Sequence, residues 1–187
     1  MPPDPLGKNQ GLVPPELYTL MATMVHEGLF VGPGSDCYKF AGSILHCARD
    51  PWYVAAQTRL LCPQQFSDYG IVIEGNGPLP LNGLWARMGY NELALNMVDA
   101  THPHYFYNKI INAGLDFITE RMAEGDAVLV HCNLGISRSP SMAFLWMFEH
   151  GFLDFNFGRA VTQFQMLYSD WSPGTGIWQY LKRRCEQ

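Results

Sequence analysis

The feature that most constrains the fold is a short apolar stretch that leads into a glycine-containing turn and then into a long apolar run. Residues 127–130 are Ala-Val-Leu-Val, a short run rich in β-branched residues that is typical of a buried strand. Pro140 follows the turn, and proline favours the first turn of a helix, which the apolar run 142–148 continues. The stretch therefore predicts a strand, a tight turn over residues 131–139 and a helix.

The predicted turn carries a thiol near its start, on Cys132, and a guanidinium near its end, on Arg138. If the turn wraps, the backbone N–H groups between them point inward and form an anion-binding nest: Asn133, Leu134, Gly135, Ile136 and Ser137. The helix N-terminus adds its positive dipole end, and the planar fork of an arginine can hold two oxygens of one anion. The turn is therefore suited to hold a tetrahedral oxyanion over a sulfur nucleophile.

The neighbouring side chains fit the same chemistry. A thiol beside a helix N-terminus and a cation ionises readily, so Cys132 is expected to be a nucleophile at neutral pH. Ser139 can donate its hydroxyl to the sulfur, and His131 is expected to brace the loop through backbone hydrogen bonds rather than act as a base. The alternative, a core cysteine and an unrelated surface arginine, leaves the glycine, the serines and Pro140 unexplained.

These residues resemble the signature loop of the cysteine-based protein tyrosine phosphatases. His131-Cys132, Gly135 and Ser137-Arg138-Ser139 are most similar to the dual-specificity branch. The resemblance extends over roughly residues 93–182, through segments similar to the family's later helices, with weaker similarity at 28–32 and 43–47. It implies a phosphotyrosine phosphatase-like fold and a hydrolase with a phosphocysteine intermediate that needs no cofactor and no metal.

A phosphatase of this kind needs an acid to protonate the leaving oxygen. Residues 93–98 predict a strand that leads to Asp99, and Pro103 opens the next helix. The distance from Asp99 to Cys132 resembles the acid-loop spacing of the family, so we assign Asp99 as the general acid. The alternative is that Asp99 only caps the following helix, but Thr101 or His102 could cap it equally well.

Other polar residues compete for such roles. Asp116 lies in a predicted helix and Asp126 in a turn before the strand, so both are expected to be solvated charges, while Asp68 and Asp170 remain rivals of Asp99. His102 and His104 flank Asp99, and exposed loop polarity is favoured over substrate contact for both.

Composition excludes several function classes. The 187 residues carry a net charge of −5, which does not favour binding to nucleic acid or to an anionic membrane. The N-terminus does not resemble a signal peptide, and no apolar run reaches membrane-spanning length.

The five cysteines lack metal-ligand spacing, and a thiolate enzyme needs a reducing setting, so a cytoplasmic protein is expected. Cys37, Cys47 and Cys62 are expected in the core, where one of them could form a disulfide with Cys132 on oxidation.

The chain is expected to form one domain over residues 1–187 of the α/β class, with a central, mostly parallel sheet of about five strands and helices on both faces. The predicted strands are 29–31, 44–47, 71–74, 93–98 and 127–130, and the predicted helices are 16–26, 105–122, 139–149, 155–168 and 174–184. The first helix would bury Leu17, Leu20, Met21 and Met24. Residues 1–15 are proline-rich and expected to be extended, and 62–92 is a possible insertion that either shapes the substrate site or decorates the surface.

The residue types in the loop also bear on the substrate. Asn133, Leu134, Ile136 and Ser137 carry no charge, whereas the lipid phosphatases that this loop resembles place lysines there, which argues against a polyphosphoinositide. The chain is short for a tyrosine-specific enzyme, so a phosphorylated protein or peptide carrying phosphotyrosine, phosphoserine or phosphothreonine is the favoured substrate. An RNA 5′-phosphatase, another non-protein phosphatase and a catalytically silent phosphopeptide-binding module remain alternatives. The sequence does not predict the oligomeric state.

Overall fold

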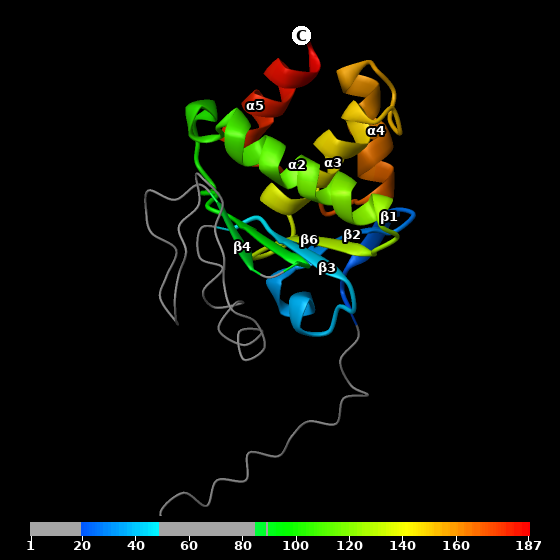
Figure 1. Cartoon of the computed structure of the whole chain (residues 1–187). Helices are drawn as coiled ribbons and strands as arrows, with labels where there is room; N and C mark the ends of the chain where they lie inside the picture. Colours follow the sequence, from blue (N-terminus) through cyan, green and yellow to red (C-terminus); the bar gives the residue numbers. More distant parts are fainter. Residues whose placement is uncertain (1–19, 49–84, 89) are drawn as a thin grey trace, which may run out of the picture.

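The computed structural model of the chain describes residues 20–48, 85–88 and 90–187. Within these residues one sheet of six strands has the order β1-β2-β6-β3-β5-β4 (Figure 1). The strands are β1 (Thr23–His26), β2 (Leu29–Pro33), β3 (Ser43–His46), β4 (Trp85–Met88), β5 (Glu92–Leu95) and β6 (Val128–Cys132). The inner pairs β2–β6, β6–β3 and β3–β5 are parallel, whereas the edge strands β1 and β4 pair antiparallel. The predicted α/β class with a mostly parallel sheet is confirmed.

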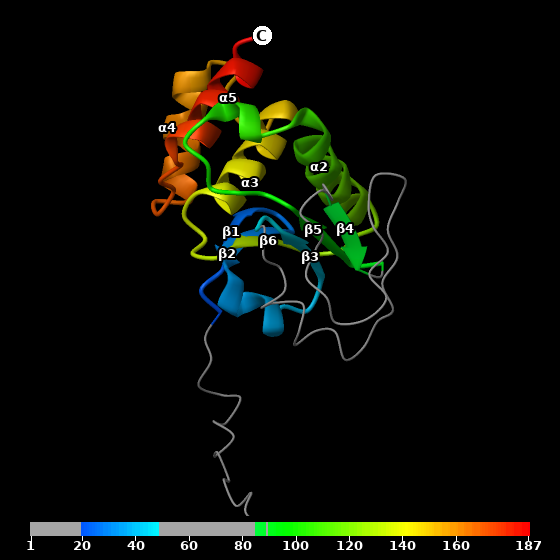
Figure 2. The same cartoon turned by 90° about the vertical axis from the view of Figure 1, so that its left-hand side faces the viewer.

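The α-helices of the described residues cover one face of the sheet. They are α2 (Asn108–Ala123), α3 (Arg138–Glu149), α4 (Phe157–Leu167) and α5 (Thr175–Cys185), and each matches a predicted helix to within a few residues. Figures 1 and 2 show these helices on one side and the short 3-10 helix η2 (Gly34–Tyr38) on the other. A second 3-10 helix, η3 (Pro103–Tyr105), precedes α2 and delays its start. None of the helices in the described part of the chain is both long and apolar enough to cross a membrane.

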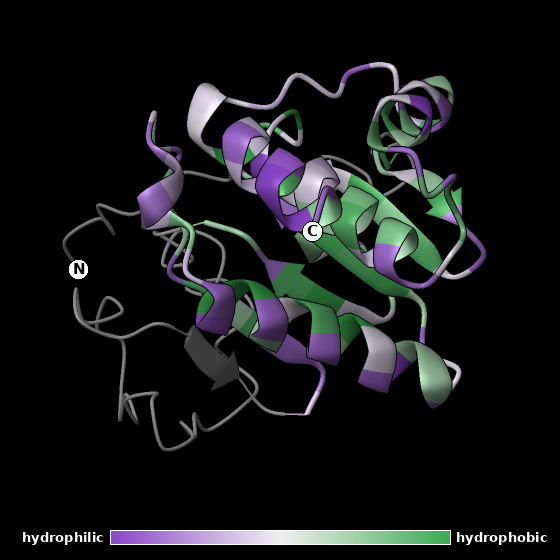
Figure 3. Cartoon of the chain, turned by 90° about the horizontal axis from the view of Figure 1, so that it is seen from above, coloured by the Kyte–Doolittle hydropathy of each residue, from purple (hydrophilic) through white to green (hydrophobic). Residues whose placement is uncertain are grey.

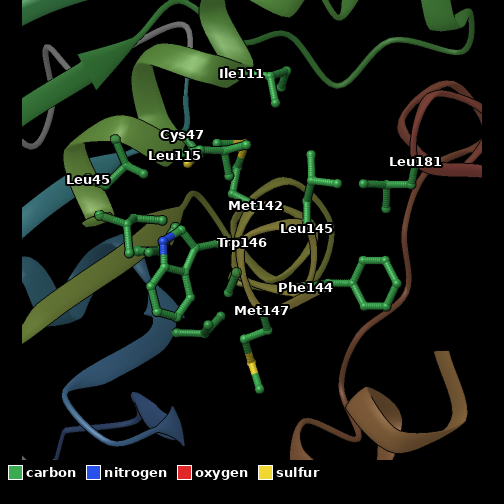
Figure 4. Close-up of a cluster of buried hydrophobic side chains, with 14 of the residues drawn as sticks. Leu45, Cys47, Ile111, Leu115, Met142, Phe144, Leu145, Trp146, Met147 and Leu181 are labelled. Atoms are coloured by element: carbon green, nitrogen blue, oxygen red, sulfur yellow. The ribbon is translucent and has the colours of Figure 1, made fainter. Parts of the chain in front are cut away.

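The core lies between the sheet and α3, which is buried around its whole circumference. Side chains of β6 alternate, with Val128 and Val130 packed in the helix-side core and Leu129 in a smaller cluster on the opposite face. Along α3 the apolar side chains from Met142 to Met147 are all buried, and Figure 4 shows them radiating from the helix axis. Figure 3 shows the strands largely hydrophobic behind helices that carry hydrophilic turns. Since β6 and α3 flank the turn 131–137, the turn is anchored at both ends in this core.

The predicted helix over 16–26 is wrong where the structure describes it. Residues Thr23–His26 form the edge strand β1, which pairs with β2 around the turn at Glu27-Gly28, where Gly28 has φ +77°. Val25 is the buried residue of this strand, while Leu20, Met21 and Met24 are exposed. Pairing with β2 and the positive φ of Gly28 fix a hairpin, and this overrides the helical spacing of the apolar residues.

Strand β4 was not predicted from the sequence. It lies in the latter part of the segment 62–92 and pairs antiparallel with β5, so residues 85–88 belong to the sheet. Several sequence predictions fall outside the described residues: the extended segment 1–15, the strand 71–74, the remainder of the possible insertion, Cys62 and Asp68. The segment predicted as the helix 105–122 buries four apolar side chains, and the residue after the C-cap of α2 is Gly125 with φ +85°. Those buried side chains are Phe106, Ile110, Phe117 and Ile118.

Candidate active site

The turn that joins β6 to α3, here called the Cys132 loop (residues 131–138), is shaped by a glycine. Gly135 has φ +78°, a backbone conformation that L side chains rarely adopt. A Cβ on Gly135 would lie 2.7 Å from the carbonyl carbon of Gly32 and 2.8 Å from the nitrogen of Pro33, at the end of β2. Only glycine fits at this position, because the loop lies directly against the neighbouring strand.

Donors outside the loop form hydrogen bonds with three of its carbonyl groups. The N–H of Gly34 donates to the carbonyl of Asn133 (3.3 Å), the Tyr168 hydroxyl to that of Gly135 (2.9 Å) and the N–H of Ser172 to that of Ile136 (2.8 Å). These carbonyls therefore point outward, away from Cys132. The arrangement leaves the loop N–H groups free to face inward, as an anion nest requires.

Cys132 lies at the base of the loop, only 2% exposed. The Ser139 hydroxyl donates to Cys132 Sγ at 3.2 Å. Burial raises the pKa of the thiol, but hydrogen bonds from the Ser139 hydroxyl and backbone, the Arg138 charge and the Gly135 N–H together hold the pKa of Cys132 below its ordinary value. The thiolate is therefore stabilised where it faces the nest.

The Arg138 side chain closes the loop opposite Cys132. It is 8% exposed, and its Nη1 donates to the carbonyl of Met97 at 3.0 Å, which ties the loop to the residues after β5. Its Nε is buried and finds no acceptor within hydrogen-bonding distance in the described parts of the chain. A buried guanidinium N–H without a partner is costly, so this nitrogen is available to an anion in the loop.

Asp99 is brought to the same place from a different element. It follows β5, its side chain is 47% exposed, and its Oδ2 lies 3.9 Å from Arg138 Nε. The Ser137 hydroxyl donates to Asp99 Oδ1 at 3.2 Å. Among the rivals that the structure describes, Asp116 and Asp170 are exposed. Asp126 is not the solvated charge expected, because it accepts a hydrogen bond from Ser43 (2.8 Å) and lies 3.7 Å from the buried Arg121.

His131 contacts a second buried histidine that sequence reasoning missed. Its Nε2 lies 2.6 Å from His46 Nδ1, and His46 Nε2 lies 3.4 Å from a carboxylate oxygen of Glu92. Burial and the neighbouring His46 lower the pKa of His131 to about 3, so its ring is neutral. Its Nδ1 lies 3.5 Å from the carbonyl of Cys132. No local pattern could reveal the pair, because His46 lies on the neighbouring strand β3.

The remaining polar residues lie at the margins of the site. His102 and His104 are exposed and their rings stack at 5.6 Å between centroids, on the stretch that follows Asp99.

An open pocket of about 400 Å³ lies beside the loop, next to the segment whose Ser172 N–H donates to the carbonyl of Ile136. It is lined by Gln165, Trp171, Ser172, Pro173, Thr175 and Trp178. Cys37 and Cys47 are buried free thiols, as expected.

Comparisons with known proteins show which fold this is. No protein-family model matches the sequence, and no curated protein matches it. Solved structures do match. The human tyrosine phosphatase-like serine/threonine/tyrosine-interacting protein superposes with a TM-score of 0.58 at 20% identity, over 87% of this chain and 94% of that chain. Human DUSP28 superposes with a TM-score of 0.60 at 16% identity, over 90% of this chain and 95% of that chain. The Cydia pomonella PTP-2 phosphatase superposes with a TM-score of 0.61 at 16% identity, over 87% of this chain and 88% of that chain.

The chain therefore has the fold of the protein tyrosine phosphatase superfamily, in its dual-specificity-like form. The resemblance seen in the sequence around Cys132 and Arg138 thus extends to the arrangement of the whole described domain.

Proposed function

We propose that this protein is a phosphomonoester hydrolase that works through a phosphocysteine intermediate on Cys132. One observation carries the proposal. Cys132 has a lowered pKa at the base of a loop whose carbonyls point outward, and Arg138, on the opposite side, has a buried Nε without an acceptor among the described residues. A site with a thiolate, loop N–H groups that can face inward and a buried arginine Nε without a hydrogen-bond acceptor suits a phosphate ester better than any other substrate class.

In the first step Cys132 Sγ attacks phosphorus and the bond from phosphorus to the leaving oxygen breaks. The leaving oxygen keeps the electron pair and takes a proton from Asp99, while Arg138 and the loop N–H groups hold the other phosphate oxygens. In the second step water attacks the phosphocysteine, the Asp99 carboxylate takes a proton from that water, and the thiolate leaves. The hydrogen bond from Ser139 stabilises the departing thiolate.

A phosphorylated protein or peptide is the proposed substrate, with phosphotyrosine and phosphoserine or phosphothreonine both accepted. The side chains that rise from the loop, Leu134 (71% exposed) and Ile136 (38% exposed), are uncharged, so they offer nothing to a second phosphate. Trp178 lines the pocket beside the loop and is partly exposed, so it offers an apolar surface for a peptide side chain. The similar structures include the Cydia pomonella PTP-2 phosphatase and a protein named "mouse putative dual specificity phosphatase". A reducing cytoplasmic setting would keep Cys132 active.

The test is phosphate release from a panel. The panel contains phosphotyrosine, phosphoserine and phosphothreonine peptides, phosphoinositides and 5′-triphosphorylated RNA, each with the wild-type chain and with Cys132→Ser. We expect release from the peptides with the wild type alone. Release from the RNA or the lipids but not from the peptides would overturn the substrate class. Binding of phosphopeptides without release from any member would show a silent binding module instead.

A further inference from the structure

Three separate segments meet at the hydroxyl of Ser137. Ser137 lies in the Cys132 loop and is 5% exposed, Gly174 is the N-cap residue of α5, and Asp99 follows β5. The N–H of Gly174 donates to Ser137 Oγ at 3.0 Å, and the Ser137 hydroxyl donates to Asp99 Oδ1 at 3.2 Å. The start of α5 is therefore linked to Asp99 through a single buried hydroxyl.

The chemistry of the groups fixes the direction of this chain of hydrogen bonds. A backbone N–H can only donate, so Ser137 Oγ accepts from Gly174 and its own hydrogen remains for Asp99. Asp99 Oδ1 is then an acceptor, and a proton on the carboxyl group must be on Oδ2. Oδ2 is the oxygen on the side of the Arg138 Nε, 3.9 Å away.

We propose that Ser137 is a positioning residue for the general acid. Its hydroxyl donates a hydrogen bond to Asp99 Oδ1, which leaves Oδ2 to deliver the proton. The inference rests on the proposed function, in which Asp99 protonates the leaving group. When the bond from phosphorus to the leaving oxygen breaks, that oxygen keeps the electron pair and takes the proton from Oδ2. The Sγ–phosphorus bond forms in the same step and Asp99 is left as a carboxylate.

Packing alone does not orient the Asp99 carboxyl group. Its side chain is about half exposed, whereas Ser137 is buried and held by the backbone of α5. A half-exposed carboxyl group rotates freely unless a fixed donor selects one of its oxygens. Ser137 provides that donor from a rigid position.

Two glycines let the acid approach α5 closely enough for this contact. A Cβ on Gly174 would lie 3.0 Å from Asp99 Oδ1 and 3.6 Å from Ser137 Oγ. A Cβ on Gly176 would lie 2.3 Å from the carbonyl oxygen of Ala100 and 2.9 Å from the nitrogen of His102. The start of α5 therefore forms a side-chain-free surface against which the residues around Asp99 lie.

The experiment compares two aryl phosphates, one with an activated phenol that leaves unaided and one with a poor leaving group. A residue that positions the acid matters only for the poor leaving group. For Ser137→Ala we expect kcat/KM to fall about tenfold or more for the poor leaving group and by less than about threefold for the activated one. Ser137→Thr, which keeps the hydroxyl, should restore most of the loss, and Gly174→Ala should reproduce it. Ser169→Ala, an exposed serine in the turn after α4, is the matched control and should change neither rate.

The double variant Ser137→Ala/Asp99→Asn separates positioning from a structural role. If Ser137 acts through Asp99, the double variant should be no slower than Asp99→Asn alone. Additive losses, or an equal loss on both aryl phosphates for Ser137→Ala, would overturn the assignment. If Asp99→Asn itself affects both substrates equally, the general-acid part of the proposed function fails first, and the Ser137 assignment fails with it.

Discussion

The Cys132 loop and the stretch that carries Asp99, here called the Asp99 loop (residues 96–102), supply the two halves of the site in different ways. In the Cys132 loop the side chains of Cys132, Ser137 and Arg138 are all at least nine-tenths buried, and donors from three other segments hold the loop carbonyls. In the Asp99 loop the functional side chain is 47% exposed. A hydrogen bond from Ser137 to Asp99 and another from Arg138 to the carbonyl of Met97 connect the Asp99 loop to the Cys132 loop.

The difference shows how the site divides its work. Outside donors hold three carbonyls of the loop that we propose binds the phosphate, so its N–H groups are in place before an anion arrives. The loop that we propose supplies the proton depends on a few directional contacts, so its performance should be sensitive to single hydroxyl groups. Changes to the residues proposed to bind the phosphate should slow every substrate. Changes to Asp99, or to Ser137 as the residue proposed to position it, should slow substrates in proportion to how poorly their leaving group departs.

The largest effect among these variants is expected for Arg138→Lys. Lysine keeps the charge but loses the planar fork that can bind two phosphate oxygens while contacting Met97. We expect a loss of about a hundredfold or more in kcat, equal for good and poor leaving groups, as for a removed transition-state donor. Steady-state kinetics on two aryl phosphates measures this loss, and Arg159→Lys, at an exposed position of α4, is the control. A loss below about threefold would show that Arg138 does not hold the transition state.

Asp99→Asn should slow a substrate with a poor leaving group far more than a substrate with an activated one. We expect about a hundredfold loss for a poor leaving group and less than about threefold for an activated aryl phosphate, because only the former needs a proton. The ratio of the two kcat/KM values is the measurement, and the exposed Asp170→Asn is the control. Equal losses on both substrates would place the acid elsewhere, with Asp68 the next candidate.

Ser139→Ala tests the hydrogen bond to the sulfur and should have the smallest effect on turnover, about tenfold. The Ser139 hydroxyl stabilises the thiolate, so its removal should raise the pKa of Cys132. The thiolate is the form that reacts with iodoacetamide, so the midpoint of alkylation rate against pH should lie below that of an ordinary cysteine thiol in the wild type and move upward in the variant. Ser169→Ala serves as the control, and an unchanged midpoint in Ser139→Ala would contradict the role.

The two loops also differ in how far the sequence predicts them. The Cys132 loop could be predicted because its strand, glycine, proline and helix follow one another, so local rules suffice. The position of Asp99 after a strand was predictable too, although β5 ends at Leu95 and not at residue 98, but the partners of Asp99 were not predictable. Ser137 and Gly174 meet Asp99 only through the fold, and His46 meets His131 across two paired strands.

The error over residues 20–26 has the same physical origin. Apolar residues with helical spacing favoured a helix, but Met21 and Met24 face outward and the backbone pairs with β2. Strand β4 likewise owes its place to pairing with β5 rather than to a pattern of its own. Pairing between strands is decided by tertiary contacts, which a periodicity within one segment does not contain.

Mass spectrometry of the protein, quenched in acid during incubation with substrate, tests the phosphocysteine step most directly. We expect a phosphate on the peptide that contains Cys132 when the wild type is incubated with a phosphotyrosine peptide. The adduct should reach a higher level with an activated aryl phosphate in Asp99→Asn, where the carboxylate that assists hydrolysis is missing. A phosphate that is absent from Cys132 while the wild type turns over, or turnover that survives Cys132→Ser undiminished, would contradict it.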